Sequence, residues 1–521
     1  LRALVDETLS DHDTVVDKMP TMEKAPLEQD LFDHRLLYIE EDTVNRMLRA
    51  ALRNHWFFYA VTFEFEPNNQ IFLSIITKWG NVINVEFTLE DLWFDDYSSS
   101  FAIRLDTNNK EEIEMKQIEG GVTAAKGYTT AGTRAGIKKG KTNKDMAMIF
   151  SEKPAVTAGT FTKNLVKAAP VLWDKKVTDA GVAQAVVINT GIANACTGQA
   201  GYENAAETAK LAGEALNISS DTVLVASTGV IGFTLPMDVI ADGVKKLSGM
   251  LKSDVQSAQD AAEAILTTDT HPKQIAYETT IGGKTVTFGA MCKGSGMIHP
   301  NMGTMLGFIM TDAAISKNLL DKALKGSIED TFNMVSVDGD TSTNDTVLVM
   351  ANGMAGNPEI TEENEDYEAF KEALLAVNTY LAKQIAGDGE GASRLFEVQV
   401  KHAKDKQTAK VLAKSIITSN LTKCAIFGKD ANWGRILCAM GYSGAQFDPL
   451  KVDIVMASEK GEIALVENGV ATAFDEEKAA EILSPDVVIA KVDVRDGDAE
   501  ATAWGCDLTY DYVKINADYR S

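Results

Sequence analysis

The residue composition changes abruptly near position 115, and this break constrains the fold more than any single motif. Residues 1–114 contain 23 Asp and Glu against 10 Lys and Arg, a net charge of −13, together with 15 of the 38 aromatic residues. They contain one of the 39 glycines, Gly80. The total charge is −25, so the other 407 residues carry −12. The sequence therefore predicts an appended segment joined near Met115 to a larger body of different character.

Residues 1–114 have the pattern of a small α+β unit. A helix is predicted over 41–53, where apolar residues recur at helical spacing. Several short runs then alternate apolar and polar residues, which is typical of half-buried strands. These predicted strands are 59–65, 71–78, 82–89 and 101–105. We expect a helix packed on an antiparallel meander, and we find no catalytic motif in it.

From Met115 the sequence becomes rich in Gly and Ala and alternates between helical and strand patterns. Amphipathic spacing predicts helices over 203–216, 237–251, 255–267 and 367–386. A strand is predicted around 396–400 and a hairpin over about 452–468. Because helical and strand stretches come partly in blocks, we expect the α/β class as a layered α+β sandwich, with a doubly wound sheet as the alternative.

The overall charge and the cysteines argue against several classes of protein. A net charge of −25 disfavours a nucleic-acid groove or an anionic-membrane binder. No apolar run approaches the length of a membrane span, and no secretory signal is expected from the first residues. The five cysteines never form a Cys-x-x-Cys pair, which disfavours a zinc ribbon or a disulfide scaffold. We expect a cytoplasmic protein with reduced, mostly buried thiols.

Two loop sequences approach ligand-binding motifs but fail on spacing. Residues 136–142, GIKKGKT, are one residue short of a phosphate-binding loop, so an exposed basic turn is the preferred interpretation. Residues 338–345, DGDTSTND, are as acidic as a calcium loop but lack its Gly at position six and its Glu at position twelve. A turn with side-chain-to-backbone hydrogen bonds is preferred there. No histidine pair has the helical spacing of metal ligands, and no metal is expected.

The segment from Lys293 to Phe308, KGSGMIHPNMGTMLGF, places a threonine between a pliable loop and an apolar run. If the bond between Gly303 and Thr304 were cut, Thr304 would own both a hydroxyl and a free α-amine. An α-amine has an unperturbed pKa of about 8 and can serve as the base for that hydroxyl. On these residues alone, a flexible surface loop leading into a strand is the simpler interpretation.

Matches along the whole segment from Met115 to Ser521 favour the catalytic interpretation. The segment closely resembles the ornithine acetyltransferase family, the glutamate N-acetyltransferases of arginine biosynthesis that use an N-terminal nucleophile. The resemblance rests on MKQIEGGVTAAKG (115–127), NTGIANACTG (189–198), STGVIG (227–232), TTDTHPK (267–273), the 293–308 loop, DGEGA (388–392), CAIFGKDANWGRI (424–436) and CDLTYDYVKINADYRS (506–521).

The resemblance implies a self-processing N-terminal-nucleophile fold that is cut between Gly303 and Thr304. The mature chains would be an α-chain, 115–303, and a β-chain, 304–521, assembled as an α2β2 heterotetramer. The family usually has Ala where this chain has Gly303. Glycine should tolerate the distorted peptide that an N-to-O acyl shift requires.

Residue roles follow from the same resemblance. Thr304 would be the nucleophile, and Thr228 and Gly229 would form the oxyanion hole, for which a hydroxyl and a backbone N–H are suitable donors. The substrate-binding residues would be Thr270, Lys293, Thr304, Glu390, Asn516 and Ser521.

The implied activity is transfer of an acetyl group from N2-acetylornithine to L-glutamate through an acetyl ester on Thr304. No organic cofactor or metal is needed, and the sequence leaves open whether acetyl-CoA is a second donor substrate. One alternative is a self-processing amidase or peptidase that uses the same nucleophile with water as acceptor. Another is that residues 1–114 are the functional part, as a ligand- or partner-binding module.

Overall fold

The computed structural model describes residues 58–66, 70–77, 82–88, 115–299 and 305–518. The chain divides into two compact units, Leu1–Glu112 and Ile113–Ser521. The described part of the first unit is a three-stranded antiparallel sheet in the order β1-β2-β3, with strands β1 (Phe58–Glu66), β2 (Gln70–Thr77) and β3 (Val82–Thr88). The meander predicted from these three runs is confirmed. The helix predicted over 41–53 and the strand over 101–105 lie outside the described residues.

The second unit is built on a mixed nine-stranded sheet in the order β4-β9-β10-β11-β12-β6-β7-β8, with β5 also paired to β6. Two neighbouring pairs, β11 with β12 and β7 with β8, run parallel, and the other pairs are antiparallel. The strands are β4 (Lys116–Ile118), β5 (Tyr128–Thr133), β6 (Met146–Phe161), β7 (Val182–Ile192), β8 (Val223–Val230), β9 (Lys273–Ile281), β10 (Lys284–Lys293), β11 (Leu306–Thr311) and β12 (Thr346–Ala351).

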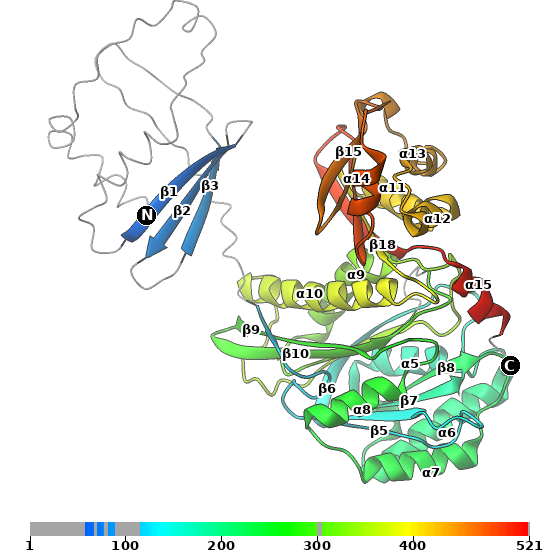
Figure 1. Ribbon diagram of the computed structural model, residues 1–521. Helices are drawn as coiled ribbons and strands as arrows, with labels where there is room; N and C mark the ends of the chain where they lie inside the picture. The colour runs from blue at the N-terminus through cyan, green and yellow to red at the C-terminus, as the bar shows by residue number, and fades with distance from the viewer. Residues whose placement is uncertain (1–57, 67–69, 78–81, 89–114, 300–304, 519–521) are drawn as a thin grey trace, which may run out of the picture. The chain divides into compact units, whose positions relative to one another are not determined.

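The central strands of this sheet are buried on both faces. Along β11 and β12, Ile309 and Val349 face one apolar core, and Phe308 and Leu348 face the other. A strand covered on both sides reads as a continuous apolar run, as β11 does. The first core contains side chains of α9 (Lys317–Asp330) and α10 (Glu365–Gly387); the second contains those of α5 (Ala169–Ala180), α6 (Gly198–Leu216), α7 (Met237–Ser248) and α8 (Val255–Ala264). Figure 1 shows α10 above the sheet and α6, α7 and α8 below it.

A six-stranded sheet follows, in the order β16-β15-β14-β17-β13-β18. Its strands are β13 (Leu395–Ala403), β14 (Asp453–Ser458), β15 (Gly461–Glu467), β16 (Val470–Ala471), β17 (Val487–Asp493) and β18 (Ala499–Cys506). The accompanying helices are α11 (Lys406–Thr418), α12 (Asn420–Gly428), α13 (Trp433–Gly441), α14 (Glu476–Ile482) and α15 (Tyr510–Ala517). Side chains of this sheet and of α11 belong to the same apolar core as those of α10.

The layered α+β architecture expected from the sequence is confirmed. The four predicted helices correspond to α6, α7, α8 and α10, the strand around 396–400 to β13, and the hairpin to β14 and β15. The prediction of mostly buried thiols is wrong, because Cys196, Cys424 and Cys438 are exposed at the surface, and Cys292 and Cys506 are buried. Among the described helices, none is long and apolar enough to cross a membrane.

Both rejected loop motifs have other uses. The buried carboxylate of Asp145 accepts hydrogen bonds from the backbone N–H groups of Ala135, Gly136 and Lys138, at 2.6, 3.0 and 3.1 Å. These donors are therefore committed within the protein rather than offered to a phosphate. The 338–345 segment is a turn in which Asp338 binds backbone N–H groups. In the described part of the chain, no three His, Cys, Asp or Glu side chains are grouped as metal ligands.

Candidate active site

The parallel pair β7 and β8 ends in two glycines with positive φ. Thr228 lies opposite Thr190, and Gly229 lies opposite Gly191. Gly229 has a φ of +130° and Gly191 a φ of +100°, conformations that side chains with a Cβ rarely adopt. A Cβ on Gly229 would lie 2.3 Å from the carbonyl carbon of Gly191. The two residues implied as oxyanion donors thus lie at a half-buried strand end whose backbone requires glycine.

Lys293 ends β10 and reaches the same place. Its side chain is buried, and its Nζ lies 3.3 Å from the Thr228 hydroxyl oxygen, 65 residues away in sequence. Burial lowers the pKa of Lys293 below the ordinary lysine value, and the nearby Asp269 carboxylate opposes this shift. A buried ammonium group that donates to a neutral hydroxyl is suited to receive a substrate carboxylate.

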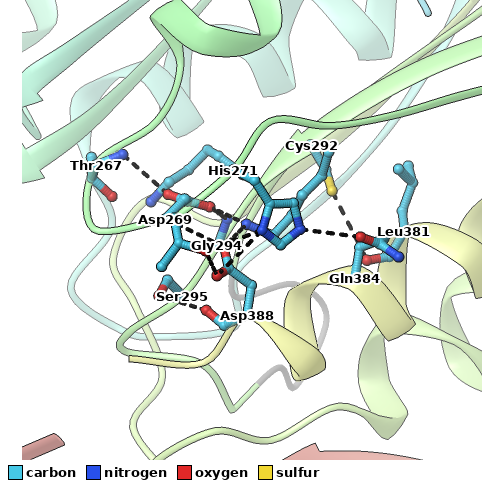
Figure 2. Close-up of polar contacts among 12 residues, drawn as sticks. Thr267, Asp269, His271, Cys292, Gly294, Ser295, Leu381, Gln384 and Asp388 are labelled. Carbon is cyan, nitrogen blue, oxygen red and sulfur yellow. Dashed lines mark hydrogen bonds and ion pairs between the residues drawn. The ribbon is translucent and has the colours of Figure 1, made fainter. Parts of the chain in front are cut away.

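Next to Lys293, a buried ion network joins two distant segments. Lys273 Nζ lies 2.7 Å from Asp269 Oδ1 and 2.5 Å from Asp388 Oδ2, and the exposed fractions of the three side chains are 0%, 0% and 4%. Asp269 also accepts from the backbone N–H groups of Thr267, at 3.1 Å, and Gly294, at 2.7 Å. Figure 2 shows these contacts between the segment that precedes β9 and the end of α10. The network was not predicted from the sequence.

The charges of this network favour one another's ionised forms. Burial disfavours the charged form of Asp269, but the Lys293 and Lys273 ammonium groups outweigh it and hold the pKa of Asp269 well below its usual range. Burial likewise disfavours charged Lys273, yet Asp269 and Asp388 raise its pKa above the ordinary value. The Asp269 carboxylate therefore stays ionised beside the Lys273 ammonium group.

Thr270 and His271 lie against the same network. Thr270 uses both its backbone N–H, at 3.0 Å from Oδ2, and its hydroxyl to bind the Asp388 carboxylate. His271 Nδ1 lies 3.1 Å from the Thr270 hydroxyl oxygen, and its Nε2 lies 3.2 Å from Gln384 Oε1 (Figure 2). The Asp388 carboxylate thus fixes the position of the predicted substrate-binding threonine.

Glu390 and Asn516 form a second polar pair. The Asn516 amide of α15 donates to Glu390 Oε2 at 2.7 Å, and Glu390 is buried. The backbone N–H of Glu390 donates to the Ser295 carbonyl at 3.0 Å. A Cβ on Gly296 would lie 2.2 Å from the Glu390 carboxyl carbon, so a side chain at this position would displace the carboxylate. These two predicted residues lie together, while Ser521 lies outside the described residues.

The described residues on either side of the predicted cleavage segment are held by the turn that precedes β12 and by the first residue of β12. Gly303 and Thr304 lie outside the described residues, which stop at His299 and resume at Met305. The Thr341 hydroxyl donates to the His299 carbonyl at 2.8 Å, and the backbone N–H of Thr346 donates to the Met305 carbonyl at 2.9 Å. The acidic turn that was set aside as a calcium site thus holds the chain just before the predicted cleavage segment, and β12 holds it just after.

Asp345 is a buried acid at this anchor and was not singled out in the sequence. It directly precedes β12, whose Thr346 pairs with Leu306 of β11, and its side chain is buried. Its Oδ2 has no hydrogen-bond partner among the described residues. Burial raises the pKa of Asp345 well above the usual carboxyl value, and Lys293 moderates the shift.

One continuous chain of contacts links five of the six predicted site residues that the structure describes. Lys293 meets Thr228, and the next residue along the chain, Gly294, donates to the Asp269 carboxylate of the ion network. That network holds Thr270, and Ser295 bonds to both Asp388 and Glu390. Charged and polar residues that are far apart in the sequence therefore come together near the ends of β8, β10 and α10.

Comparison with known proteins identifies the family. The model described as "ArgJ family" matches residues 129–521, more than half of the chain. The chain belongs to the ArgJ family. The arginine biosynthesis bifunctional protein ArgJ of Symbiobacterium thermophilum is 53% identical over 408 residues, which are 78% of this chain and 100% of that protein. ArgJ 1 of Clostridium acetobutylicum is 54% identical over 395 residues, 76% of this chain and 96% of that protein.

A solved structure is also similar to this ArgJ-family chain. The ornithine acetyltransferase of Mycobacterium tuberculosis, complexed with ornithine, is 40% identical, covers 36% of this chain and 99% of its own, and has a TM-score of 0.34. The resemblance predicted from the sequence is confirmed by the family match, and with it the acyltransferase class. The roles assigned to individual residues stay predictions.

Proposed function

We propose that residues 115–521 are a glutamate N-acetyltransferase of arginine biosynthesis, which moves acetyl from N2-acetylornithine to L-glutamate. The observation that carries the proposal is the 3.3 Å contact between Lys293 Nζ and the Thr228 hydroxyl at the glycine-built end of β8. It brings a cation suited to a substrate carboxylate next to a group suited to an oxyanion. An acyl donor that carries a carboxylate fits such a pair.

The first half-reaction begins after cleavage of the bond between Gly303 and Thr304. The Thr304 hydroxyl attacks the acetyl carbonyl of the donor, and its proton passes to the Thr304 α-amine. The hydroxyl of Thr228 and the backbone N–H of Gly229 donate to the oxygen that becomes negative. The tetrahedral intermediate then expels ornithine, whose amine takes the proton from the α-amine, and an acetyl ester of Thr304 remains.

In the second half-reaction the α-amine of glutamate attacks the ester carbonyl. The same oxyanion donors serve again, the glutamate nitrogen loses a proton to the Thr304 α-amine, and the Thr304 oxygen leaves with a proton. N-acetylglutamate is released and the hydroxyl is restored. Because ornithine leaves before glutamate reacts, the proposal requires ping-pong kinetics.

The remaining residues hold the amino-acid part of each substrate. The Lys293 ammonium pairs with a carboxylate, and the Glu390 carboxylate, held by Asn516, receives an ammonium group. Thr270 supplies a further polar contact, and Ser521 completes the site from the C-terminus. Such a site needs no metal or organic cofactor, and acetyl-CoA is a second candidate donor. We further propose the α2β2 assembly of the 115–303 and 304–521 chains, in the cytoplasm.

The nucleophile can be tested by replacing Thr304 with Ala. Intact-mass analysis under denaturing conditions should find the wild type as two chains divided at Gly303 and Thr304, and the Ala variant as one chain without acetyl transfer. Thr304→Ser is the matched control, because it keeps a hydroxyl and an α-amine after cleavage. An active Ala variant would contradict the mechanism. Acetate release that does not depend on glutamate would favour water as the acceptor.

The contribution of residues 1–114 to acetyl transfer is tested separately. A chain that begins at Met115 should keep the acetyl-transfer activity of the full chain, since the described site residues all lie beyond that position. Loss of transfer on truncation, with the fold retained by circular dichroism, would instead make residues 1–114 part of the functional unit.

A further inference from the structure

The hydroxyl group of Thr270 is bound to a buried carboxylate. Thr270 Oγ1 donates to Asp388 Oδ1, and Thr270 N donates to Asp388 Oδ2 at 3.0 Å. A hydroxyl has one proton and two lone pairs, and an ionised carboxylate can only accept. The single proton of the Thr270 hydroxyl is therefore committed to Asp388, so the oxygen can only accept from a further partner.

The Asp388 carboxylate is held in its orientation by burial and by its other hydrogen bonds. Its side chain is 4% exposed, and its Oδ2 is held by Lys273 Nζ at 2.5 Å. Lys273 is itself held by Asp269 at 2.7 Å. His271 Nδ1 lies 3.1 Å from the Thr270 oxygen and occupies one approach to it, and a further donor can reach the oxygen from another side.

This oxygen borders an open pocket. Thr270 is exposed, and it lines a pocket of about 570 Å³ together with His271, Asp388 and Asp511 of α15. Thr270 thus combines a hydroxyl polarity that is fixed by Asp388 with a position in the wall of the pocket.

We propose that Asp388 is a specificity-determining positioning residue, which makes Thr270 select substrates that present an N–H donor. The chemical class is an N-acylated amino acid, whose amide N–H can donate to the Thr270 oxygen, and the discriminated class is the ester analogue, which has an acceptor oxygen at that point. The inference rests on the proposed function, because it takes the Thr270 contact with substrate from there. It adds Asp388 as the residue that determines which substrate groups Thr270 can bind.

The substitution Asp388→Asn should reverse the hydrogen-bonding polarity of the Thr270 hydroxyl. Position Oδ2 receives two donors, Lys273 Nζ and the Thr270 backbone N–H, so the Asn oxygen should occupy it. The Asn amide nitrogen then lies at the former Oδ1 and donates to the Thr270 oxygen. The Thr270 hydroxyl proton is released toward the pocket, where it suits an acceptor.

The experiment compares two donors, N2-acetylornithine and the acetate ester of 2-hydroxy-5-aminopentanoic acid, as kcat/KM for transfer to glutamate. The ester is intrinsically more reactive, but this cancels when the amide-to-ester ratio of each variant is divided by that of the wild type. An unpaired polar group of this kind costs about ten- to a hundredfold, so Asp388→Asn should lower the ratio by about that factor. Asp511→Asn, which removes a carboxylate from the same pocket, should keep the wild-type ratio.

A merely structural role for Asp388 predicts a different result, in which both donors lose activity in equal proportion and the ratio stays fixed. That result would overturn the proposal. Thr270→Val gives an independent arm that leaves the ion network intact: it should also lower the ratio, and a wild-type ratio in this variant would overturn the proposal even if Asp388→Asn does not fold. Failure of the proposed function is distinguishable, since the wild type would then transfer acetyl from neither donor, and the inference would fall with it.

Discussion

The buried ion network makes Lys273 the residue whose loss should cost this site most. Its side chain is 0% exposed and its Nζ bridges Asp269 and Asp388 at 2.7 and 2.5 Å. The substitution Lys273→Met keeps an unbranched side chain of similar length but removes the charge. Two carboxylates are then left buried and close together, without the cation that both contact.

Breaking a buried ion pair by removing one partner costs about 3–5 kcal/mol. Two carboxylates are affected here, but Asp269 keeps two backbone N–H donors and Asp388 keeps the donors of Thr270, so we expect a loss within that range rather than twice it. At an m-value of about 3 kcal/mol/M, a loss of this size lowers the urea midpoint by about 1–1.7 M.

The midpoint is measured by urea unfolding, followed by tryptophan fluorescence. The matched control is Lys175→Met, which breaks the pair with Asp179 on the surface of α5, where both side chains are 66% exposed. An exposed pair of this kind contributes at most about 1 kcal/mol. Equal midpoints for Lys273→Met and Lys175→Met would refute the argument that Asp269 and Asp388 depend on a buried cation.

Three further predictions concern the catalytic groups themselves. Gly229→Ala forces a Cβ against the Gly191 backbone at a φ of +130° and should lower kcat by about 10²–10³, as for a lost oxyanion donor, in steady-state assays. Because the pKa of Lys293 is lowered, its ammonium form is lost as pH rises toward the usual lysine value, so KM for the amino-acid substrates should rise in alkaline solution. Gly296→Ala displaces the Glu390 carboxylate and should raise KM with a smaller effect on kcat.

Each of these has a matched control. Gly283→Ala also places a Cβ at positive φ, +70°, but in open space, and Gly326→Ala places one in open space on α9; both should keep the wild-type kinetics. Lys293→Arg keeps its charge in alkaline solution, so its KM should stay flat with pH. A wild-type kcat in Gly229→Ala would count against Gly229 as an oxyanion donor. The same alkaline rise of KM in wild type and Lys293→Arg would count against Lys293 as the group that titrates. An unchanged KM in Gly296→Ala would count against Glu390 as a substrate-binding residue.

Much of the fold could be predicted from periodicity, because long elements repeat their pattern many times. The apolar face of 367–386 predicted α10, and the unbroken apolar run after Met305 predicted the doubly buried strand β11. The exposure of three of the five cysteines was missed, since burial of one residue on a helix or in a loop depends on tertiary packing that sequence spacing does not encode.

The site, too, was predicted from the sequence only in part. The pairing of Lys293 with Thr228 and of Glu390 with Asn516 joins residues singled out beforehand. The Lys273 network was missed, because Asp388 lies more than a hundred residues from Asp269 and Lys273, and each of the three alone reads as a solvated charge. Asp345 was missed for a related reason: it lies in an acidic turn, and its burial arises from the pairing of β11 with β12.

The central claim is that Thr304 carries the acetyl group between donor and acceptor. The most direct measurement is denaturing mass spectrometry of the enzyme after incubation with N2-acetylornithine in the absence of glutamate. The account predicts a chain that begins at Thr304 and is heavier by one acetyl group, located on that residue by fragmentation and removed when glutamate is added. An enzyme that turns over while its chain stays uncut before Thr304, or while no acetyl group appears on that residue, would contradict it.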